Sequence, residues 1–580
     1  MNILGIFGGY YNSAACLLGS GRLLAFIEEE KVSRNKDEKG FPVKAVKYCL
    51  KCSGLKLSDI NYIAFPWQPL KNLTTLPLIA VKEMIKRFFS SGAKTTPSSK
   101  LPAGFHDLLV LLQGAESQTR HMISAGLRYN GIDGRIPPIV FTGHHLSHAA
   151  SVFYASGFDR SLIYVTDGMG DDLSTSLWIG EGKSLRSIKK FYFPNSLGEF
   201  YAAFTEFLGF EPYSHEGKLM GLAAYGEKDD EIIEKIKKHI ISYHNGKYQV
   251  NSLYTVNGAH DYGERFTNLL VDLFGSPRLP EAKIETFHFN LAHAAQALLE
   301  QASENVLGYY MKKTGIKDVC ISGGVGMNCK MNGHLLHALP IEKIFINPAS
   351  NDAGSAMGAA LALSMQKGVD PRFTMTHACF GPGFSSVQVE AVLKEARVKY
   401  RKSKNIPEDA AKALAQGKII GWHQGRQEAG ARALGSRSIL ASPLSKSMID
   451  KINKNVKHRE PWRPFAPSLL AECAGDYYSL GKMSPFMILA FTVNKDKRRI
   501  IPAVTHIDNT CRPQTVTRSD NPRYYDLIRA FEKKTGVPVI LNTSFNVRGE
   551  PIVSTPADSL RCFFATGIEQ LFIEDFIVEK

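Results

Sequence analysis

Several features that define common classes of protein are missing from this 580-residue chain. No apolar run approaches the roughly 20 residues that a membrane-spanning helix needs, and the first eight residues carry no basic segment of the kind that opens a signal peptide. No biased tract interrupts a composition with 44% hydrophobic and 22% charged residues, which is typical of globular and not of disordered chains. We therefore expect a cytoplasmic, globular protein of two or more domains that has no membrane partner.

Two frequent kinds of site are missing as well. The P-loop pattern GxxxxGK[ST] does not occur, so a nucleotide would have to be held by another architecture. The nine cysteines include a single CxxC pair, Cys49 and Cys52, without a second pair that would complete a zinc site. We interpret the cysteines as reduced core thiols.

The formal net charge of +15 is not concentrated in any basic arm. Lysine and arginine are spread along the chain, whereas nucleic-acid binding is typical of basic tracts interleaved with aromatic residues. We therefore expect no nucleic-acid partner. Small anionic substrates, or simply a lysine-rich surface, account for the charge equally well.

The most informative stretch, residues 143–171, places two histidines before a strand. His144 and His148 stand four residues apart in an Ala- and Ser-rich segment, so a helix there would project both imidazoles from one face, as a metal requires. Residues 161–166 predict a β-strand that ends at Asp167, and ligands bind at the carboxyl ends of strands in open α/β sheets. A metal site is one interpretation, and a buried helix face with satisfied imidazoles is the other.

Two later segments have a related pattern. Residues 318–328 predict a β-strand that leads into clustered glycines and a helix, which is typical of nucleotide binding at a helix N-terminus. Residues 344–352 predict another strand, which ends in Asp352 ahead of a small-residue helix over 355–363. Asp352 is therefore the fourth candidate metal ligand.

Two other segments are less specific. Residues 1–8 and 22–28 predict the strands of a hairpin whose glycine-containing turn, residues 9–15, could cradle a phosphate. Residues 215–223 combine glycines with an acid, a base and an imidazole. This combination indicates either a substrate loop or a glycine-rich helix start.

Arginine and lysine recur beside proline, tryptophan and small hydrogen-bond donors in the last third of the chain. Pro and Gly mark a linker around residues 368–384, and beyond it residues 421–437, 457–465, 506–514 and 542–549 each show this combination. Guanidinium forks suit bidentate capture of phosphate or carboxylate. Each segment alone could be a surface run, but we favour an anion-binding groove.

Six motifs follow one another along the chain: HHLSHA, VTDGMGD, SGGVGMN, NDAGSAMGAA, VKHREPWRPFAP and NTSFNVRGEPI. With them the chain resembles, over nearly its whole length, the NodU/CmcH family of O-carbamoyltransferases. The resemblance implies an α/β fold in which an actin-like ASKHA domain (a duplicated ribonuclease-H-like fold) occupies residues 1–372. A linker at 373–402 and a C-terminal YrdC-like α/β domain at 403–580 would follow.

The same resemblance implies an activity. The C-terminal domain would form carbamoyladenylate from carbamoyl phosphate and ATP, with Mg²⁺ expected to accompany ATP. The N-terminal domain would then transfer the carbamoyl group to a hydroxyl of a small metabolite, such as a sugar or a natural product. Making a water-sensitive anhydride in one closed groove and passing it internally to another limits its hydrolysis.

Site residues also follow from the resemblance. Iron would be held by His144, His148, Asp167 and Asp352, although two imidazoles and two carboxylates also suit other divalent first-row metals. The adenylate would lie along Asp167, Gly168, Gly170, Asp171, Gly198, Gly324 and Asn328. Carbamoyl phosphate and ATP would be held by Lys457, Arg463, Arg512 and Ser544, with Arg432 nearby.

The acceptor end of the site departs from the family pattern. Lys36 matches a family lysine near the acceptor, but Tyr10 stands where family members carry a histidine that assists the acceptor hydroxyl. A tyrosine with an ordinary pKa near 10 is a poor base at neutral pH. The acceptor pocket itself would be built from loops such as residues 71–102 and 215–226.

Two alternative functions stay open at this point. Threonylcarbamoyl-type transfer to tRNA would use the same fold, but the chain lacks a basic arm. A catalytically degenerate ASKHA scaffold is supported only by the substitution at Tyr10. The sequence predicts neither the acceptor nor the oligomeric state.

Overall fold

The computed structural model describes residues 1–9, 12–69, 116–460 and 462–580. Tyr10 and the predicted acceptor loop at 71–102 therefore lie outside the described residues. Within the described ranges, none of the helices combines the length and the apolar character that a membrane crossing requires.

The same strand order occurs in two sheets of the N-terminal part. One sheet has the order β3-β2-β1-β4-β5, and the other has the order β12-β11-β6-β7-β8. In both, three strands consecutive in sequence lie side by side, and two later strands extend the sheet beyond the first of the three. β4 and β5 run parallel to β1, as β11 and β12 run parallel to β6. This repetition confirms the predicted duplicated, actin-like domain.

The bounds of these strands are as follows. The first sheet contains β1 (Asn2–Phe7), β2 (Ala14–Gly19), β3 (Arg22–Glu28), β4 (Tyr62–Phe65) and β5 (Ile139–Phe141). The second contains β6 (Arg160–Gly170), β7 (Leu173–Glu181), β8 (Ser184–Tyr192), β11 (Val319–Ser322) and β12 (Ile344–Ile346). A separate hairpin consists of β9 (Ile241–His244) and β10 (Lys247–Val250).

The predicted hairpin of residues 1–8 and 22–28 is wrong, because β2 lies between those strands in sequence. Its residues, AACLLG, are almost all buried and show no polar alternation, so period-two patterning does not reveal a strand. The tight turn instead connects β2 to β3 at Ser20 and Gly21, which both have positive φ. That combination is typical of the type I′ hairpin turn.

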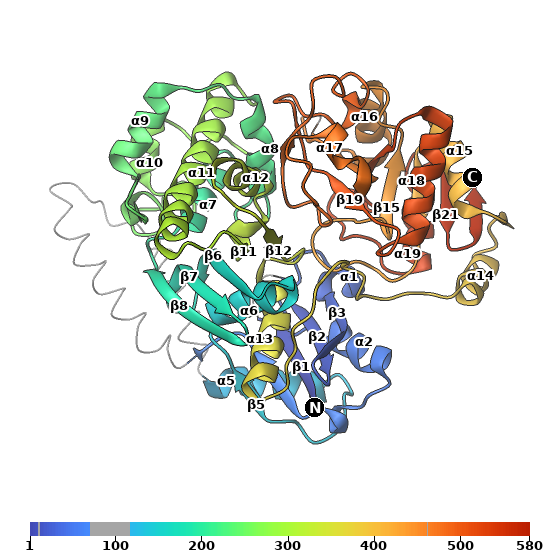
Figure 1. The fold of residues 1–580 in the computed structure, drawn as a ribbon, viewed down its shortest axis with the longest axis horizontal. Coiled ribbons are helices and arrows are strands. Elements are labelled where there is room, and N and C mark those ends of the chain that lie inside the picture. The colour runs from blue at the N-terminus through green and yellow to red at the C-terminus, as the bar shows by residue number, and fades with distance from the viewer. Residues whose placement is uncertain (10–11, 70–115, 461) are drawn as a thin grey trace. The chain divides into compact units, whose positions relative to one another are not determined.

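Helices α6 and α13 pack against each other beside these sheets (Figure 1). A Cβ atom on Gly358 of α13 would lie 1.8 Å from the carbonyl oxygen of Ser147 on α6, so the small residues of α13 permit this close approach. Residues 216–222 form α8. Of the two interpretations of residues 215–223, a substrate loop or a helix start, the structure supports the helix start. The helices are α5 (Glu116–Arg128), α6 (His144–Ser156), α7 (Leu197–Phe207), α8 (Glu216–Leu222), α9 (Asp230–His239), α10 (Asn268–Phe274), α11 (Thr286–Thr314), α12 (Cys329–Ala338) and α13 (Asp352–Gln366).

The C-terminal part is built on a mixed sheet with the order β13-β22-β21-β14-β15-β20-β16-β19. Helices α15 and α18 pack together (Figure 1), and the core that includes their apolar residues contains the buried Trp422, Tyr524 and Phe531. The strands of the sheet are β13 (Tyr400–Lys402), β14 (Ile420–His423), β15 (Arg437–Ala441), β16 (Ala466–Leu470), β19 (Gln514–Val516), β20 (Val539–Ser544), β21 (Gln570–Ile573) and β22 (Phe576–Glu579).

The remaining strands and α-helices lie in the C-terminal part, apart from α1 and α2, which lie between β3 and β4 in sequence. β17 (Phe491–Thr492) pairs with β18 (Thr510–Cys511). The helices are α1 (Glu29–Ser33), α2 (Val43–Ser53), α14 (Ser386–Glu395), α15 (Ile406–Ala415), α16 (Ser447–Ile452), α17 (Ala474–Tyr477), α18 (Pro522–Thr535) and α19 (Pro556–Phe564). The predicted linker, 373–402, thus contains α14 and β13. The domain boundaries themselves stay a prediction.

The chain divides into two compact units, and each is discontinuous in sequence. Unit 1 comprises Met1–Phe7, Leu18–Arg22 and Lys56–Phe373, and unit 2 comprises Gly8–Leu17, Leu23–Leu55 and Thr374–Lys580. Within unit 2, Lys31 is 1% exposed. Its Nζ donates to the carbonyl oxygens of Glu428 (2.8 Å) and Gly430 (2.6 Å) and pairs with Glu28 at 3.0 Å. An early segment of the chain is thereby fixed inside this unit by buried polar contacts.

Candidate functional site

Helix α6 carries two imidazoles on one face, as its sequence predicts. His144 is the first residue of the helix and His148 lies one turn later, and both side chains are fully buried. Their Nε2 atoms are 3.0 Å apart. The helical spacing therefore brings both rings to one point.

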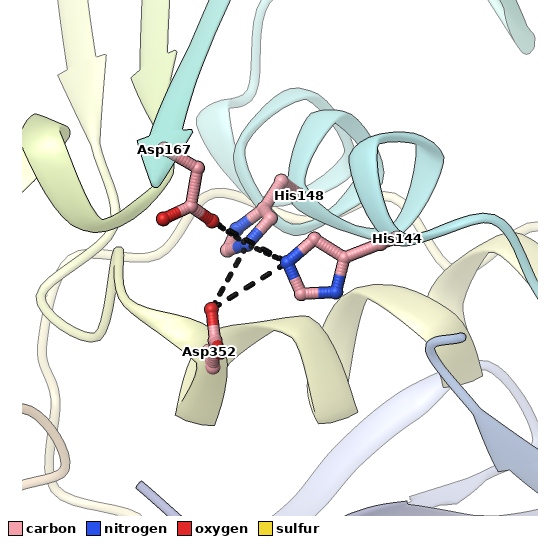
Figure 2. A group of neighbouring side chains, drawn as sticks. All are labelled: His144, His148, Asp167 and Asp352. Atoms are coloured by element: carbon pink, nitrogen blue, oxygen red, sulfur yellow. Dashed lines mark hydrogen bonds and ion pairs between the residues drawn. The ribbon is translucent and has the colours of Figure 1, made fainter. Parts of the chain in front are cut away.

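Two carboxylates from other elements reach the same point (Figure 2). Asp167 lies on β6 and Asp352 is the first residue of α13. Oδ2 of Asp167 is 3.4 Å from Nε2 of His144 and 3.2 Å from Nε2 of His148, and Oδ1 of Asp352 is 3.5 and 3.6 Å from the same atoms. We call His144, His148, Asp167 and Asp352 the imidazole–carboxylate cluster.

The atoms behind the cluster fix the orientation of its members. Nδ1 of His144 donates to the carbonyl oxygen of Pro66 at 3.1 Å, and Nδ1 of His148 lies 3.2 Å from Oγ of Ser322. Oδ1 of Asp167 accepts from the backbone N–H groups of Gly168 (2.9 Å) and Gly324 (3.2 Å). Because these outer atoms are occupied, both Nε2 atoms and Oδ2 of Asp167 are directed into the cluster. Such outer hydrogen bonds are typical of metal ligands.

The donor set fits a divalent first-row metal. Ligand atoms about 2.1 Å from one ion lie roughly 3.0–3.4 Å from each other, and the four ligand atoms here lie within 4.8 Å of one another. Two imidazoles and two carboxylates without a thiolate suit iron, zinc or manganese. Asp352 is the most exposed member, at 25% of its side chain, so the cluster is accessible from that side.

Burial and charge act against each other at the cluster. Burial lowers the pKa of His144, but its hydrogen bonds with Asp167 and Asp352 outweigh burial and raise the pKa well above its ordinary value. Burial raises the pKa of Asp167, yet the two imidazoles bring it well below its ordinary value. The carboxylates therefore hold positive charge at this point.

Three of the predicted adenylate residues, Gly168, Gly198 and Gly324, lie beside Asp167. A Cβ on Gly198 would lie 2.6 Å from the backbone nitrogen of Gly168, and one on Gly324 would lie 2.9 Å from Oδ1 of Asp167, so the backbone of Gly198 approaches that of Gly168 closely and the backbone of Gly324 approaches the Asp167 carboxylate. Asn328 caps α12, its Oδ1 accepting from the backbone N–H of Met331 at 2.9 Å. Nucleotide binding by these residues stays a prediction.

A second group of predicted residues meets in unit 2. Lys457, which is 4% exposed, ends a π-helical turn, Asn453–Lys457. Its Nζ donates to Oγ (3.3 Å) and the carbonyl oxygen of Ser544, and to Oδ1 (2.8 Å) and the carbonyl oxygen (2.9 Å) of Asn546. π-Helical turns occur frequently at functional sites.

Several arginines lie close enough to this lysine for their charges to repel its own. Burial and the neighbouring charges of Arg459 and Arg463 lower the pKa of Lys457 well below its ordinary value. Burial, followed by repulsion from Arg512 and Arg548, also lowers the pKa of Arg463 despite Glu460. We call Lys457, Arg459, Arg463, Arg512 and Arg548 the cationic cluster.

The cationic cluster has the properties of an anion site. Burial lowers the pKa of Arg459 to about 9, with Arg463 and Arg512 adding to the shift. The buried Nε of Arg512 has no hydrogen-bond partner among the described residues. A bound phosphate or carboxylate would satisfy such a nitrogen and offset the repulsion between cations.

The structure adds residues that sequence reasoning did not assign. Asn546, Arg459 and Arg548 lie within motifs already singled out, but no pattern separates them from their neighbours. Of the remaining predicted residues, Arg432 is half-buried between β14 and β15. Lys36 is 37% exposed and pairs with Asp37 at 3.1 Å.

Comparison with protein families identifies the chain. The model described as carbamoyltransferase N-terminus matches residues 2–361, and the one described as carbamoyltransferase C-terminus matches residues 411–580. The chain belongs to the carbamoyltransferase family. It is therefore a carbamoyltransferase enzyme, as its motifs predict.

Relatives of this carbamoyltransferase extend over most of its length. An uncharacterized protein of Synechocystis sp. is 36% identical, covering 100% of this chain and 97% of that protein. The nodulation protein NolNO of Sinorhizobium fredii is 35% identical over 98% of this chain and 79% of its own length. The nodulation protein NolO of Bradyrhizobium diazoefficiens is 38% identical over 75% and 78%.

Solved structures similar to this carbamoyltransferase are more distant. The ROK hexokinase of Thermus thermophilus is 13% identical, covers 63% of this chain and 100% of its own, and has a TM-score of 0.32. Full-length HypF in a phosphate- and nucleotide-bound form is 12% identical, covers 64% and 56%, and has a TM-score of 0.30. At these low scores, the fold assignment rests on the repeated strand order.

Proposed function

We propose that this carbamoyltransferase makes carbamoyladenylate from carbamoyl phosphate and ATP in unit 2, and transfers the carbamoyl group to a hydroxyl of a small metabolite in unit 1. The observation that carries the proposal is the presence of two clusters of opposite character in one carbamoyltransferase chain, one around the buried Lys457 and one around the buried His144 and His148. The cationic cluster suits two phosphate-bearing substrates. The imidazole–carboxylate cluster suits a metal beside glycine-rich loops of the kind that receive a nucleotide.

The cationic cluster would bind and orient the two anionic substrates. In the balanced step, carbamoyl phosphate and water give carbamate and phosphate. A carbamate oxygen then bonds to the α-phosphorus of ATP as the bond to pyrophosphate breaks. Lys457 and the arginines offset the charge of the phosphates in a partly desolvated site, where charge-assisted hydrogen bonds are strongest. Ser544 and Asn546 hold the ammonium of Lys457 at its place.

The imidazole–carboxylate cluster would serve the transfer step. His144, His148, Asp167 and Asp352 would hold the metal, which when bound supplies Lewis-acid stabilisation of negative charge on the adenylate's oxygens. The backbone at Gly168, Gly198 and Gly324 would approach the adenylate closely. The acceptor hydroxyl then bonds to the carbamoyl carbon, the bond to AMP breaks, and the hydroxyl proton passes to the released AMP or to water.

The acceptor is proposed as a small hydroxylated compound, a sugar or a natural product. The motif resemblance supports an O-carbamoyltransferase, and the spread of basic residues without a basic arm disfavours tRNA. Iron is the metal that the resemblance implies. A cytoplasmic location is part of the same proposal.

One experiment with the whole chain tests the function. Purified protein is incubated with ATP, Mg²⁺ and carbamoyl phosphate, and pyrophosphate, phosphate and carbamoyladenylate are measured. A panel of sugars, natural products and tRNA is then added, and a carbamoyl mass gain is sought. We expect pyrophosphate release that depends on carbamoyl phosphate, and carbamoylation of a small hydroxylated compound. Absence of carbamoyladenylate, or modification of tRNA alone, would contradict the proposal.

A further inference from the structure

The chain turns sharply after β6 at a buried carboxylate. Asp171 has a φ of +54° and is 3% exposed. Its Oδ2 accepts from the backbone N–H of His144 at 2.8 Å, and its Oδ1 accepts from the backbone N–H of Gln68 at 2.8 Å. One side chain thus connects the end of β6 with the start of α6 and with the segment after β4.

The contact with His144 has the character of a helix cap supplied from elsewhere in the chain. The first N–H groups of a helix have no partner within the helix and usually bond to the side chain of the N-cap residue. The N-cap of α6 is Gly143, which has no side chain. Asp171 supplies the acceptor instead, and its negative charge is favourable at the positive end of the helix dipole.

The contact with Gln68 acts on the other side of the same imidazole. Pro66, two residues earlier, provides the carbonyl oxygen that accepts from Nδ1 of His144 at 3.1 Å. The ring of Trp67 packs against that imidazole, with 4.9 Å between the two ring centroids. Asp171 therefore holds both the backbone of His144 and the segment that orients its ring.

The glycine before Asp171 leaves space for the ring. A Cβ atom on Gly170 would lie 2.0 Å from Cδ2 and 2.7 Å from Cγ of His144. Real Cβ atoms do not approach ring carbons so closely, and the fully buried ring is packed against Trp67. A side chain at position 170 must therefore displace His144 from the other three members of the cluster.

We propose that Asp171 and Gly170 are positioning residues of the metal centre, and that the second half of the VTDGMGD motif serves His144 and not the adenylate. The inference rests on the proposed metal binding by the imidazole–carboxylate cluster. Asp171 fixes the place of the imidazole through the backbone N–H of His144 and holds the segment whose Pro66 carbonyl sets its tautomer, and Gly170 provides the space into which the ring fits.

The test compares metal binding by matched variants of the whole chain. Fe²⁺ and Mn²⁺ are titrated anaerobically into chelator-treated protein, and affinity and stoichiometry are measured by competition with a chelator of known strength. Asp171→Asn keeps the shape but loses the charge and one acceptor. Asp229→Asn is the control, because Asp229 caps α9 by accepting from Glu231 and Ile232 at 3.1 Å each.

We expect about one metal ion per wild-type chain, as for one four-ligand site. Asp171→Asn should bind it about 10- to 100-fold more weakly, the usual cost of removing an outer contact of a metal ligand. Gly170→Ala should weaken binding in the same direction, and Asp229→Asn should match wild type. Thermal unfolding in chelator identifies folded variants, and Gly170→Ala carries the test if Asp171→Asn does not fold.

Three results would overturn the inference. If folded Asp171→Asn and Gly170→Ala bind metal as wild type does, the positioning role is wrong while the metal site stands. If they lose affinity for carbamoyladenylate in metal-free protein and keep metal affinity, both residues belong to the nucleotide site. If wild type itself takes up no metal, the proposed metal function fails, and the inference fails with it.

Discussion

The imidazole–carboxylate cluster and the cationic cluster hold uncompensated charge of opposite sign. In the first, two carboxylates raise the pKa of His144 despite its burial, so the site attracts positive charge. In the second, burial and repulsion between cations lower the pKa of Lys457, Arg459 and Arg463, so the site attracts negative charge. Buried charge without a partner is costly. Each cluster would therefore be stabilised by its own ligand.

The two clusters also differ in what positions them. The members of the first lie on a strand and in the first turns of two helices; backbone groups hold the outer atoms of His144 and Asp167, and the hydroxyl of Ser322 lies against Nδ1 of His148. The members of the second lie on a π-helical turn and on loops, where Lys457 is held by Ser544 and Asn546. Changes in the first should therefore act on metal binding, and changes in the second on substrate binding.

The largest effect expected from this contrast is at the cationic cluster. Arg512→Ala should slow pyrophosphate release by a factor of between about 30 and several thousand. Truncating one partner of a buried charge-assisted contact costs about 2–5 kcal/mol. Metal content should not change. Arg518→Ala is the matched control, because that side chain is 71% exposed. Added carbamoyladenylate should restore carbamoylation, and failure of this rescue would contradict a separate second site.

At the imidazole–carboxylate cluster the opposite result is expected. His148→Ala should remove most of the bound metal, because one of four ligands is lost, and should stop carbamoyl transfer. Pyrophosphate release should continue, and added carbamoyladenylate should not restore transfer. Elemental analysis and the two assays measure this, with the exposed His121→Ala as control. Equal loss of pyrophosphate release in His148→Ala and Arg512→Ala would indicate one shared active site.

A smaller effect, on stability, is expected at Glu216, a carboxyl group that is neutralised by a proton and not by a ligand. Burial raises the pKa of Glu216 from 4.5 to about 7, and Glu199 and Glu211 add to the shift. The folded state therefore holds this proton between about pH 4.5 and 7, where the unfolded state has lost it. The free energy of unfolding should fall as pH rises through this window, by up to about 3 kcal/mol.

Glu216→Gln should remove that pH dependence. Urea unfolding at pH 5 and pH 8 should show a variant that is more stable than wild type at pH 8 and similar to it at pH 5. Glu231→Gln, at a side chain that is 78% exposed, should follow wild type at both values. A wild-type protein that is no less stable at pH 8 than at pH 5 would contradict the assignment.

The smallest effect is expected at the N-terminal cap of α7, which supports the imidazole–carboxylate cluster. Ser196 caps α7 by accepting from Glu199 N–H at 3.1 Å and donates to the carbonyl oxygen of Gly168 at 2.7 Å. Ser196→Ala should lower the free energy of unfolding by about 0.5–2 kcal/mol. Ser385→Ala, at the cap of α14 in unit 2, should cost a similar amount. Only Ser196→Ala should weaken metal binding as well, because Gly168 adjoins Asp167.

The parts of the site that were predicted depend on local patterns. Helical spacing predicts that His144 and His148 share a face, and strand ends predict the places of Asp167 and Asp352. The structure brings these four residues together, while metal binding stays a prediction. Lys457 and Ser544 are also brought together: Lys457 ends a helical turn and Ser544 ends β20.

Other parts could not be predicted, because they depend on contacts between distant segments. Nothing in the sequence near Gly143 indicates that Asp171 supplies its missing cap, or that the carbonyl of Pro66 orients His144. β2 was missed because an entirely buried strand shows no alternation. Arg459 and Asn546 were not assigned because only three-dimensional proximity distinguishes them from other polar residues of their motifs.

The discontinuity of unit 2 has a consequence for how the protein is made. Residues 23–55 leave the ribosome long before residues 374–580, yet the two segments belong to one compact unit. At about 5–20 residues per second, the intervening segment 56–373 takes roughly 15 to 60 s to synthesise. Throughout that time Lys31 lacks Glu428 and Gly430, and the hydroxyl of Tyr48 on α2 lacks the carbonyl oxygen of Phe380 and the guanidinium of Arg426. Unit 2 can therefore be completed only after residues 374–580 have been synthesised, and until then its early segment lacks its buried polar partners.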